Sequence, residues 1–295
     1  MIDQNQRLNV VYACDNTFVP LLAASIKSLE INSPGVIKDI HIVNDNISAK
    51  NIQKLKNSFN SQEINLIIHE TKDVTGPTNN VPRFYGQALP STTFYRLYVQ
   101  NIVPKGTERV VYLDADMIVL EHLTKLWEID LKGNILAAVQ DPGIKTLGCS
   151  WGGGIKNYAD FGYQSEDKYL NSGMLVIDLP AWIKNEVMEK ALEVSVNHRK
   201  HLVYADQYCI NAVIANRWLP LDSKWNHFVN NDEPGAFLIH YTGLKPIYTN
   251  YPYSKKYQDI FFQYLNKTAW KDMKLITITA QKIRLAKHFL RKLIS

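Results

Sequence analysis

Apolar and polar residues alternate along the first part of the chain in blocks that predict strands and helices in turn. Apolar runs at 8–14, 37–45 and 64–68 have the length of strands. Between these runs, apolar residues recur at helical spacing at Val19, Leu22, Ile26 and Leu29, and again at Ile52, Leu55 and Phe59 behind Ser48, a potential N-cap. Strands that alternate with helices in this way are typical of an α/β fold with a mostly parallel sheet.

Longer irregular segments interrupt this pattern in the middle of the chain. The stretches 70–90 and 143–168 show no sustained period, and loops of that length within a compact domain are usually functional. The remaining pattern predicts a helix from Ser91 that carries Arg96, a turn at 169–173 followed by a strand, and helices from Pro180 to Val194, from Asp206 and from Tyr253 to Trp270.

Two carboxylates lie in the middle of the most apolar run, Val110–Leu120. Burial of an ionised carboxylate is unfavourable unless it is paired or bound to a metal ion. If the backbone stays extended through Ala115, its period of two places Asp114 and Asp116 on one side, where both reach a single hard cation such as Mn²⁺ or Mg²⁺. The alternative is a strand that ends at Leu113, followed by a solvated turn. Both interpretations fit this stretch equally well.

Further polar residues follow predicted strands directly. They are Asp15 and Asn16 after the first strand, Asp141 after 135–140, and His240 after 236–239. Ligands of open α/β sheets bind at the carboxyl ends of strands, so these residues are candidates for one site. Plain structural alternatives exist, because a lone histidine is more often a hydrogen-bonded structural residue, Asp206 fits a helix N-cap, and Arg96 fits a surface helix.

Composition excludes several classes of protein. The chain has 295 residues and a formal net charge of +5, and its three cysteines form no CxxC pair, so neither a zinc site nor a disulfide framework is indicated. The polar residues 1–9 lack the apolar core of a signal peptide, and we expect a cytoplasmic protein. Nucleic-acid binding is not indicated, because the basic residues gather in one short segment.

That basic segment is the C-terminal stretch 271–295. It contains seven lysines and arginines against Asp272 alone, so the remaining chain has a net charge of −1. Ile283, Ala286, Leu290 and Leu293 share one helical face, which predicts a basic amphipathic helix on an anionic membrane surface. The alternative is a terminal helix that docks on the body. We therefore expect two parts, a main domain at 1–270 and the helical appendage at 271–295.

Seven short motifs occur in an order that resembles glycosyltransferase family eight, the group that contains glycogenin and bacterial lipo-oligosaccharide galactosyltransferases. The motifs are Ala13-Cys14-Asp15-Asn16, Thr93-Phe94-Tyr95-Arg96-Leu97, Tyr112-Leu113-Asp114-Ala115-Asp116, Asp141, Asn171-Ser172-Gly173, Asp206-Gln207, and His240 with Gly243 and Lys245. The resemblance extends from the first strand to about Pro246.

The resemblance implies a Rossmann-like, nucleotide-sugar-binding mixed sheet of the GT-A type. It implies a retaining transfer of galactose or glucose from UDP-galactose or UDP-glucose, dependent on Mn²⁺ with Mg²⁺ as an alternative. By the same resemblance, Asp114, Asp116 and His240 would bind the metal. The other residues that it assigns are Ala13, Asp15, Asn16 and Ala115 for the nucleotide, Gly243 and Lys245 for the diphosphate, and Arg96, Asp141, Asn171, Asp206 and Gln207 around the donor sugar, with Gln207 in a supporting role.

One departure concerns the diphosphate loop. In the family the lysine usually lies three residues beyond the glycine and precedes Pro-Trp, whereas Lys245 lies two beyond Gly243 and precedes Pro246-Ile247. The acceptor that we expect is a glycan or glycolipid at the inner face of a bacterial cytoplasmic membrane. The alternatives are a protein-linked glycan, or a non-catalytic module that binds sugar nucleotides.

Overall fold

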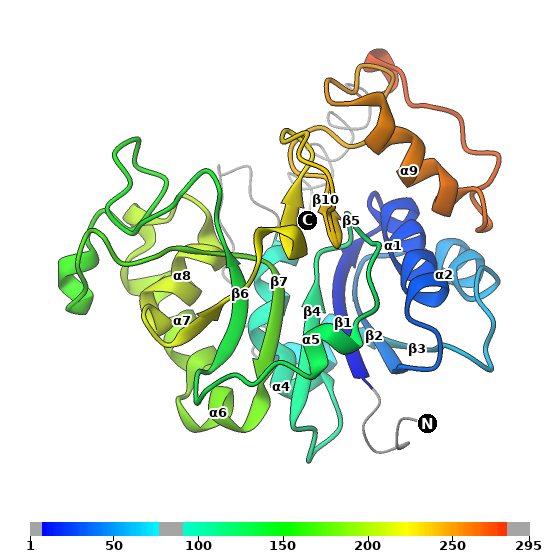
Figure 1. The fold of residues 1–295 in the computed structure, drawn as a ribbon. Helices are drawn as coiled ribbons and strands as arrows, with labels where there is room; N and C mark the ends of the chain where they lie inside the picture. Colours follow the sequence, from blue (N-terminus) through cyan, green and yellow to red (C-terminus); the bar gives the residue numbers. More distant parts are fainter. Residues whose placement is uncertain (1–7, 77–90, 282–295) are drawn as a thin grey trace, which may run out of the picture.

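A mixed seven-stranded sheet forms the centre of the molecule (Figure 1). The computed structural model describes residues 8–76 and 91–281. The strands are β1 (Leu8–Asp15), β2 (Ile37–Asp45), β3 (Asn65–Glu70), β4 (Arg109–Leu113), β6 (Leu136–Gln140), β7 (Leu170–Asp178) and β8 (Trp218–Pro220), in the order β3-β2-β1-β4-β7-β6-β8. The first four strands are parallel, but β7 is antiparallel to both β4 and β6. The α/β fold and its mostly parallel sheet are confirmed, and β7 is the one antiparallel strand that makes this sheet mixed.

The acidic run 110–120 is two strands in two different sheets, so the predicted continuous strand is wrong. The first part is β4, and the second is β5 (Met117–Val119), which joins β10 (Leu238–His240) and β9 (His227–Phe228) in a three-stranded sheet. β5 pairs antiparallel with β10, and Met117 lies opposite His240. Asp114, Ala115 and Asp116 form the turn between the two sheets.

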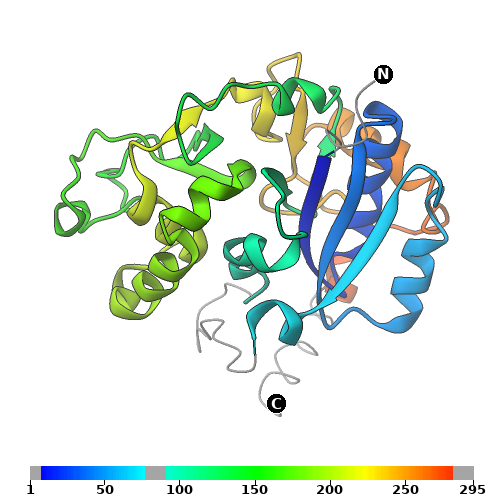
Figure 2. The same cartoon turned by 90° about the horizontal axis from the view of Figure 1, so that it is seen from below.

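Alternate residues of β1 face two separate hydrophobic cores. Val10 and Tyr12 belong to the core that also contains apolar residues of α1 (Val19–Asn32) and α9 (Lys255–Leu265). Val11 and Ala13 belong to the opposite core, under η2 (Ser91–Tyr98), α6 (Leu179–Lys184), α7 (Val187–Asn197) and α8 (Ala205–Ile214). The sheet is therefore buried on both faces, as its nearly unbroken apolar strands predict. Figure 2 shows α1 and α2 on one side of the sheet and α7 and α8 on the other.

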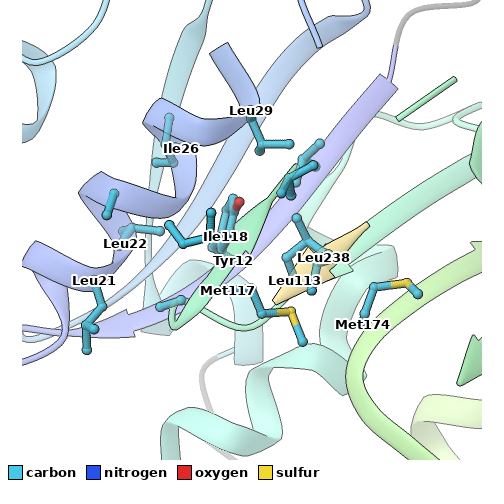
Figure 3. Close-up of a cluster of buried hydrophobic side chains, with 14 of the residues drawn as sticks. Tyr12, Leu21, Leu22, Ile26, Leu29, Leu113, Met117, Ile118, Met174 and Leu238 are labelled. Carbon is cyan, nitrogen blue, oxygen red and sulfur yellow. The ribbon is translucent and has the colours of Figure 1, made fainter. Parts of the chain in front are cut away.

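The first core extends onto the turn that carries the carboxylates. Figure 3 shows Leu22 and Ile26 of α1 on one side of Tyr12, with Met117 and Ile118 of β5 next to Tyr12. The backbone N–H of Val119 donates to Ser28 Oγ at 2.9 Å, which ties β5 to α1. The chain on the carboxyl side of the acidic turn is thus fixed by a buried helix.

Most predicted helix positions are confirmed. α1 and its end at Asn32 agree with the pattern, and Ser48 caps α2 (Ala49–Lys56) by accepting a hydrogen bond from the Asn51 N–H. The shorter helices are α3 (Thr71–Thr75), α4 (Val99–Ile102), α5 (Thr124–Trp127), η3 (Tyr158–Phe161), η4 (Arg199–His201) and η5 (Ser223–Asn226).

The helix from Ser91 is confirmed with Phe94, Leu97 and Ile102 buried, although it is mostly 3₁₀ and continues as α4. Three other local predictions are wrong. The predicted loop 70–90 opens with the short helix α3, while residues 77–90 lie outside the described part. The helix from Pro180 breaks into α6 and α7 at Glu186, whose φ is 55°. The segment 169–173 enters β7 instead of turning, because its backbone pairs with β6 on one side and its Gly173 carbonyl accepts from the N–H of Asp114 on the other.

The chain just beyond residue 270 packs against the same body. Ile276 is buried, its N–H donates to the Ile247 carbonyl at 2.8 Å, and its carbonyl accepts from Thr249 N–H at 3.0 Å. The predicted amphipathic face from Ile283 to Leu293 lies outside the described residues, so the two-part division at residue 270 stays a prediction. Among the helices that the structure describes, none has the length and apolar character needed to cross a bilayer.

Candidate active site

Asp114, Asp116 and His240 converge where the two sheets meet. One potential ligand atom from each lies within 4.8 Å of the others. His240 Nε2 is 3.8 Å from Asp114 Oδ2 and 3.5 Å from Asp116 Oδ1. Each sequence interpretation was therefore half right: the backbone turns after Leu113, but Asp116 is buried at 8% exposed and the Asp114 side chain is 24% exposed, so the turn is not a solvated one.

The close approach of these groups depends on Gly173 of β7. A Cβ atom at this position would lie 2.6 Å from His240 Cε1, 2.9 Å from Met117 Cε and 3.0 Å from Asp114 Oδ2. Only glycine leaves room for the histidine ring and the carboxylate side by side.

Asn226, at the end of η5, orients His240. Its Oδ1 lies 2.9 Å from His240 Nδ1, and since an amide oxygen only accepts, Nδ1 carries the proton. In the neutral form of the ring, the lone pair of Nε2 then points toward the two carboxylates. A histidine whose second nitrogen donates to a neighbouring oxygen is the usual arrangement of a metal ligand, so the residues present fit a hard divalent cation. Asn226 has no distinctive sequence context, and the sequence analysis did not find it.

Arg96 is buried between two carboxylates. Its NH2 and Nε groups are each 2.9 Å from a carboxylate oxygen, of Asp114 and of Asp206 respectively, and its guanidinium lies 4.7 Å from the centre of the Tyr112 ring. Burial alone would lower the pKa of Arg96, but the two carboxylates raise it above its usual value, so the residue stays charged. The alternatives of a surface arginine and of an N-cap aspartate are both wrong, because Asp206 is buried and the N-cap of α8 is Tyr204.

Lys245 pairs directly with one of the candidate metal ligands. Its ammonium lies 2.5 Å from Asp116 Oδ2 and 2.7 Å from the Tyr241 carbonyl. Burial would raise the pKa of Asp116, but Lys245 and His240 lower it, and Asp116 is ionised. Gly243 makes the preceding turn at φ 71°, where a Cβ would lie 2.5 Å from the Tyr253 hydroxyl. The predicted contact of Lys245 with a diphosphate stays a prediction.

A connected set of buried polar side chains lies next to this centre. Asn171 Oδ1 accepts from Asn226 Nδ2 at 2.7 Å, and Asn171 Nδ2 donates to Asp141 Oδ2 at 2.8 Å. Gln207 Nε2 donates to the same Asp141 oxygen at 3.1 Å, while Gln207 Oε1 accepts from the Ser172 N–H at 3.0 Å. The amide of Gln207 is therefore bonded within the protein at both ends, which fits the supporting role predicted for it.

Asp141 and Asp206 are both strongly hydrogen-bonded. Asp141 Oδ1 accepts from the N–H groups of Gly143 and Ile144 at 2.9 and 2.8 Å, in addition to the two bonds to Oδ2. Asp206 Oδ2 accepts from Ser172 Oγ at 2.9 Å besides its ion pair with Arg96. These bonds fix both carboxylates in place, an arrangement that suits an electrostatic role for both residues.

A cavity opens on the other side of the metal-ligand candidates. Among the described residues, its lining combines the carboxyl end of β1, η2 and the acidic turn: Ala13, Cys14, Asp15, Phe18, Thr92, Thr93, Arg96, Tyr112, Asp114, Ala115 and Asp116. Asp15 Oδ1 accepts from the N–H groups of Thr17 and Phe18 at 2.7 and 3.0 Å, which fixes the loop into α1. The Asn16 side chain does not line this cavity and instead contacts the start of α2. Its Oδ1 accepts from Ser48 N–H and Asn51 Nδ2, both at 2.9 Å.

A family model described as glycosyl transferase family 8 matches residues 9–247. The chain belongs to glycosyl transferase family 8. The resemblance drawn from the seven motifs is thereby confirmed. The residue roles that it implied stay predictions, but the structure gathers all of the predicted residues except Asn16 around two connected places: the metal-ligand candidates with their cavity, and the Asp141–Gln207 cluster.

Several curated relatives of this family 8 chain are bacterial glycosyltransferases. It is 28% identical to glycosyltransferase GlyB of Streptococcus pneumoniae over 90% of its own length, but it spans only 63% of that relative. It is 24% identical to a lipopolysaccharide 1,2-glucosyltransferase of Escherichia coli, covering 92% of this chain and 81% of the relative.

Among solved structures, the family 8 chain resembles the galactosyltransferase LgtC in complex with donor and acceptor sugar analogs. The TM-score is 0.73 at 22% identity, with 90% of this chain and 100% of LgtC covered. This similarity confirms the GT-A type of fold.

Proposed function

We propose that this family 8 chain transfers a hexose from a UDP-sugar to a glycan or glycolipid acceptor with retention of configuration. The observation that carries the proposal is the convergence of Asp114, Asp116 and an oriented His240 at the rim of a cavity that also receives Arg96 and the end of β1. A diphosphate needs a centre of positive charge, and the nucleotide of an open α/β sheet binds at the carboxyl ends of its strands.

The three converging residues would hold Mn²⁺, with Mg²⁺ as an alternative. The bound ion would supply Lewis-acid stabilisation of the negative charge that develops on the departing diphosphate. Lys245 adds a second positive charge next to Asp116, and Arg96 holds Asp114 in place and opposes the rise that burial causes in its pKa. Asp15, Ala13 and Ala115 line the nucleotide side of the cavity.

On the sugar side, the anomeric carbon becomes electron-poor as the bond to UDP breaks. Preorganised oxygens stabilise such a centre without a change in protonation. Asp141, Asp206 and Gln207 are held in place by Asn171, Ser172 and Arg96, so their dipoles and charges are fixed before the donor binds.

The acceptor proposal follows the relatives. An acceptor in lipopolysaccharide is supported by the Escherichia coli glucosyltransferase, and a protein-linked glycan is the alternative. An assay that offers lipid extracts and glycoprotein in parallel separates the two. For donors, we propose UDP-galactose or UDP-glucose, in a cytoplasmic setting at the inner face of the membrane.

UDP release is the direct test of the donor and the metal. We expect UDP-galactose or UDP-glucose to be turned over with Mn²⁺, and activity to be lost with EDTA. Asp116→Asn should reduce the rate at least about 100-fold, because it removes a ligand charge, whereas Asp259→Asn, on the exposed face of α9, should not. Equal activity of the Asp116→Asn variant and the wild type would contradict the assignment of Asp116 as a metal ligand. Tight UDP binding whose affinity does not depend on metal, with no turnover of UDP-sugar, would instead favour a non-catalytic binding module.

We further propose that the basic C-terminal segment binds an anionic membrane surface. Removal of all of 271–295 is a poor test, because Ile276 is part of the core. Removal of 282–295 keeps Ile276, and it should abolish sedimentation with phosphatidylglycerol vesicles while UDP-sugar hydrolysis persists. Unchanged sedimentation of the shortened protein would contradict this proposal.

A further inference from the structure

Three large apolar side chains are exposed together beside the Asp141–Gln207 cluster. Trp151 is 58% exposed, Tyr204 41% and Val203 40%. Trp151 belongs to the long loop 143–168, and the other two directly precede α8. The rings of Trp151 and Tyr204 meet edge to face, with centroids 6.4 Å apart and planes at 83°. Exposed aromatic groups that gather in this way mark interaction sites more often than single exposed residues do.

The Trp151 ring is held in one orientation. Its Nε1–H donates to the Gly143 carbonyl at 3.0 Å. Gly153 lies so close to the ring that a Cβ atom there would be 2.3 Å from Trp151 Cη2, so the loop backbone supports the indole. A hydrogen bond, a backbone contact and a Tyr204 ring thus fix a side chain whose remaining surface faces solvent. A fixed aromatic surface offers a large contact area and loses little conformational entropy on binding.

Hydrogen bonds connect this surface to the site in a defined order. From His240 the bonds run through Asn226 and Asn171 to Asp141, whose Oδ1 accepts from Gly143 N–H. The carbonyl of that same Gly143 accepts from Trp151. The aromatic surface is therefore joined through Gly143 and Asp141 to the polar cluster that we propose for the donor sugar.

We propose that Trp151 and Tyr204 form a stacking surface for a pyranose ring of the acceptor. The C–H face of a hexopyranose is apolar and matches a flat indole, while its hydroxyl groups remain in water or reach the polar cluster. The inference rests on the proposed function, because it gives the acceptor side of the same site. It also makes the identity of residues 151 and 204 a determinant of acceptor choice and leaves the donor side unchanged.

The kinetic test separates acceptor from donor. Methyl β-D-galactopyranoside, methyl β-D-glucopyranoside and lactose are offered as acceptors, with UDP release measured with and without them. Trp151→Ala should raise the acceptor KM about 10-fold, and Trp151→Phe should raise it less. Hydrolysis of the UDP-sugar without acceptor should stay within about 2-fold of the wild type. Ile183→Ala, which removes an exposed apolar side chain from α6, is the matched control and should change neither value.

A binding measurement tests the surface without turnover. Of the other five tryptophans, four are at most 7% exposed, namely Trp182, Trp218, Trp225 and Trp270, and Trp127 of α5 is partly buried. A fluorescence change caused by a sugar that stacks on Trp151 should therefore disappear in Trp151→Phe. The wild type should show a saturable change with at least one of the three glycosides. Tyr204→Ala, which keeps all tryptophans, should weaken the apparent affinity about 10-fold.

Several outcomes overturn the inference. They are the absence of a saturable fluorescence change with all three sugars, an acceptor KM of Trp151→Ala equal to that of the wild type, or an equal loss of UDP-sugar hydrolysis in that variant. If no UDP-sugar is turned over but the glycosides still bind at Trp151, the proposed transfer fails while the sugar surface stands.

Discussion

The ion pair between Lys245 and Asp116 predicts that this lysine opposes metal binding in the free protein. Asp116 Oδ1 faces His240, whereas its Oδ2 is bonded to the lysine ammonium. A cation bound by Asp116 must share that carboxylate with Lys245 and is repelled by its positive charge. Lys245→Met keeps most of the length of the side chain and removes the charge, so we expect it to bind Mn²⁺ more tightly than the wild type when no nucleotide is present.

The magnitude follows from the burial of the pair. The Lys245 and Asp116 side chains are 15% and 10% exposed, so solvent screens their interaction only in part. Two unit charges 4 Å apart interact by about 4 kcal/mol at an effective dielectric constant of about 20. Relaxation of the site reduces this figure, and measured couplings of close charge pairs start at about 1.5 kcal/mol. We therefore expect Mn²⁺ to bind Lys245→Met about 10- to 100-fold more tightly.

Electron paramagnetic resonance of free Mn²⁺ measures this affinity directly. The sign should reverse when UDP is added, because the proposed function gives Lys245 a contact with the diphosphate, and the variant should then bind Mn²⁺ with UDP more weakly. Lys125→Met is the control, since it breaks an exposed pair with Glu121 elsewhere and should change neither affinity. An unchanged or weaker Mn²⁺ affinity of nucleotide-free Lys245→Met would refute the reasoning.

Two further predictions concern a histidine at the site and one far from it. Asn226→Ala removes the acceptor that orients His240, so Mn²⁺ affinity measured by calorimetry should fall about 10- to 100-fold, while Asn226→Asp, which keeps an acceptor, should lose less; equal affinities of the two variants would contradict this role. Burial, and then the neighbouring His69, lower the pKa of His41 to about 4. Because an unfolded histidine titrates near 6.5, the folded state binds fewer protons, and stability should be complete above pH 6.5 and fall by up to about 3 kcal/mol as the pH drops toward 4. Urea midpoints across this range should fall less in His41→Gln, and an identical pH slope in the variant and the wild type would argue against the assignment.

Local periodicity correctly predicted the helices and strands whose limits are set by residues close together in the sequence. The strand at 37–45 and the ends of α1 agree with the structure because their apolar spacing and their stop signals are local. The prediction of one continuous helix from Pro180 was wrong, because Glu186 adopts a left-handed conformation that no residue pattern marks. The break at Glu186 lets α6 and α7 pack separately on the sheet.

The acidic run shows what the sequence by itself determined and what tertiary structure decided. Two aspartates in an apolar run already indicated that, if they are buried, a positive charge must compensate them, because buried charge is unfavourable wherever the run lies. The sequence could not say that the run breaks at Leu113, since the break arises when β10, more than a hundred residues later, pairs with Met117–Val119. That pairing delivers His240 to the carboxylates, and Gly173 leaves space for it. The residue types thus set the chemistry of the site. Long-range backbone pairing decided which side chains meet, and local periodicity carries no information about such pairing.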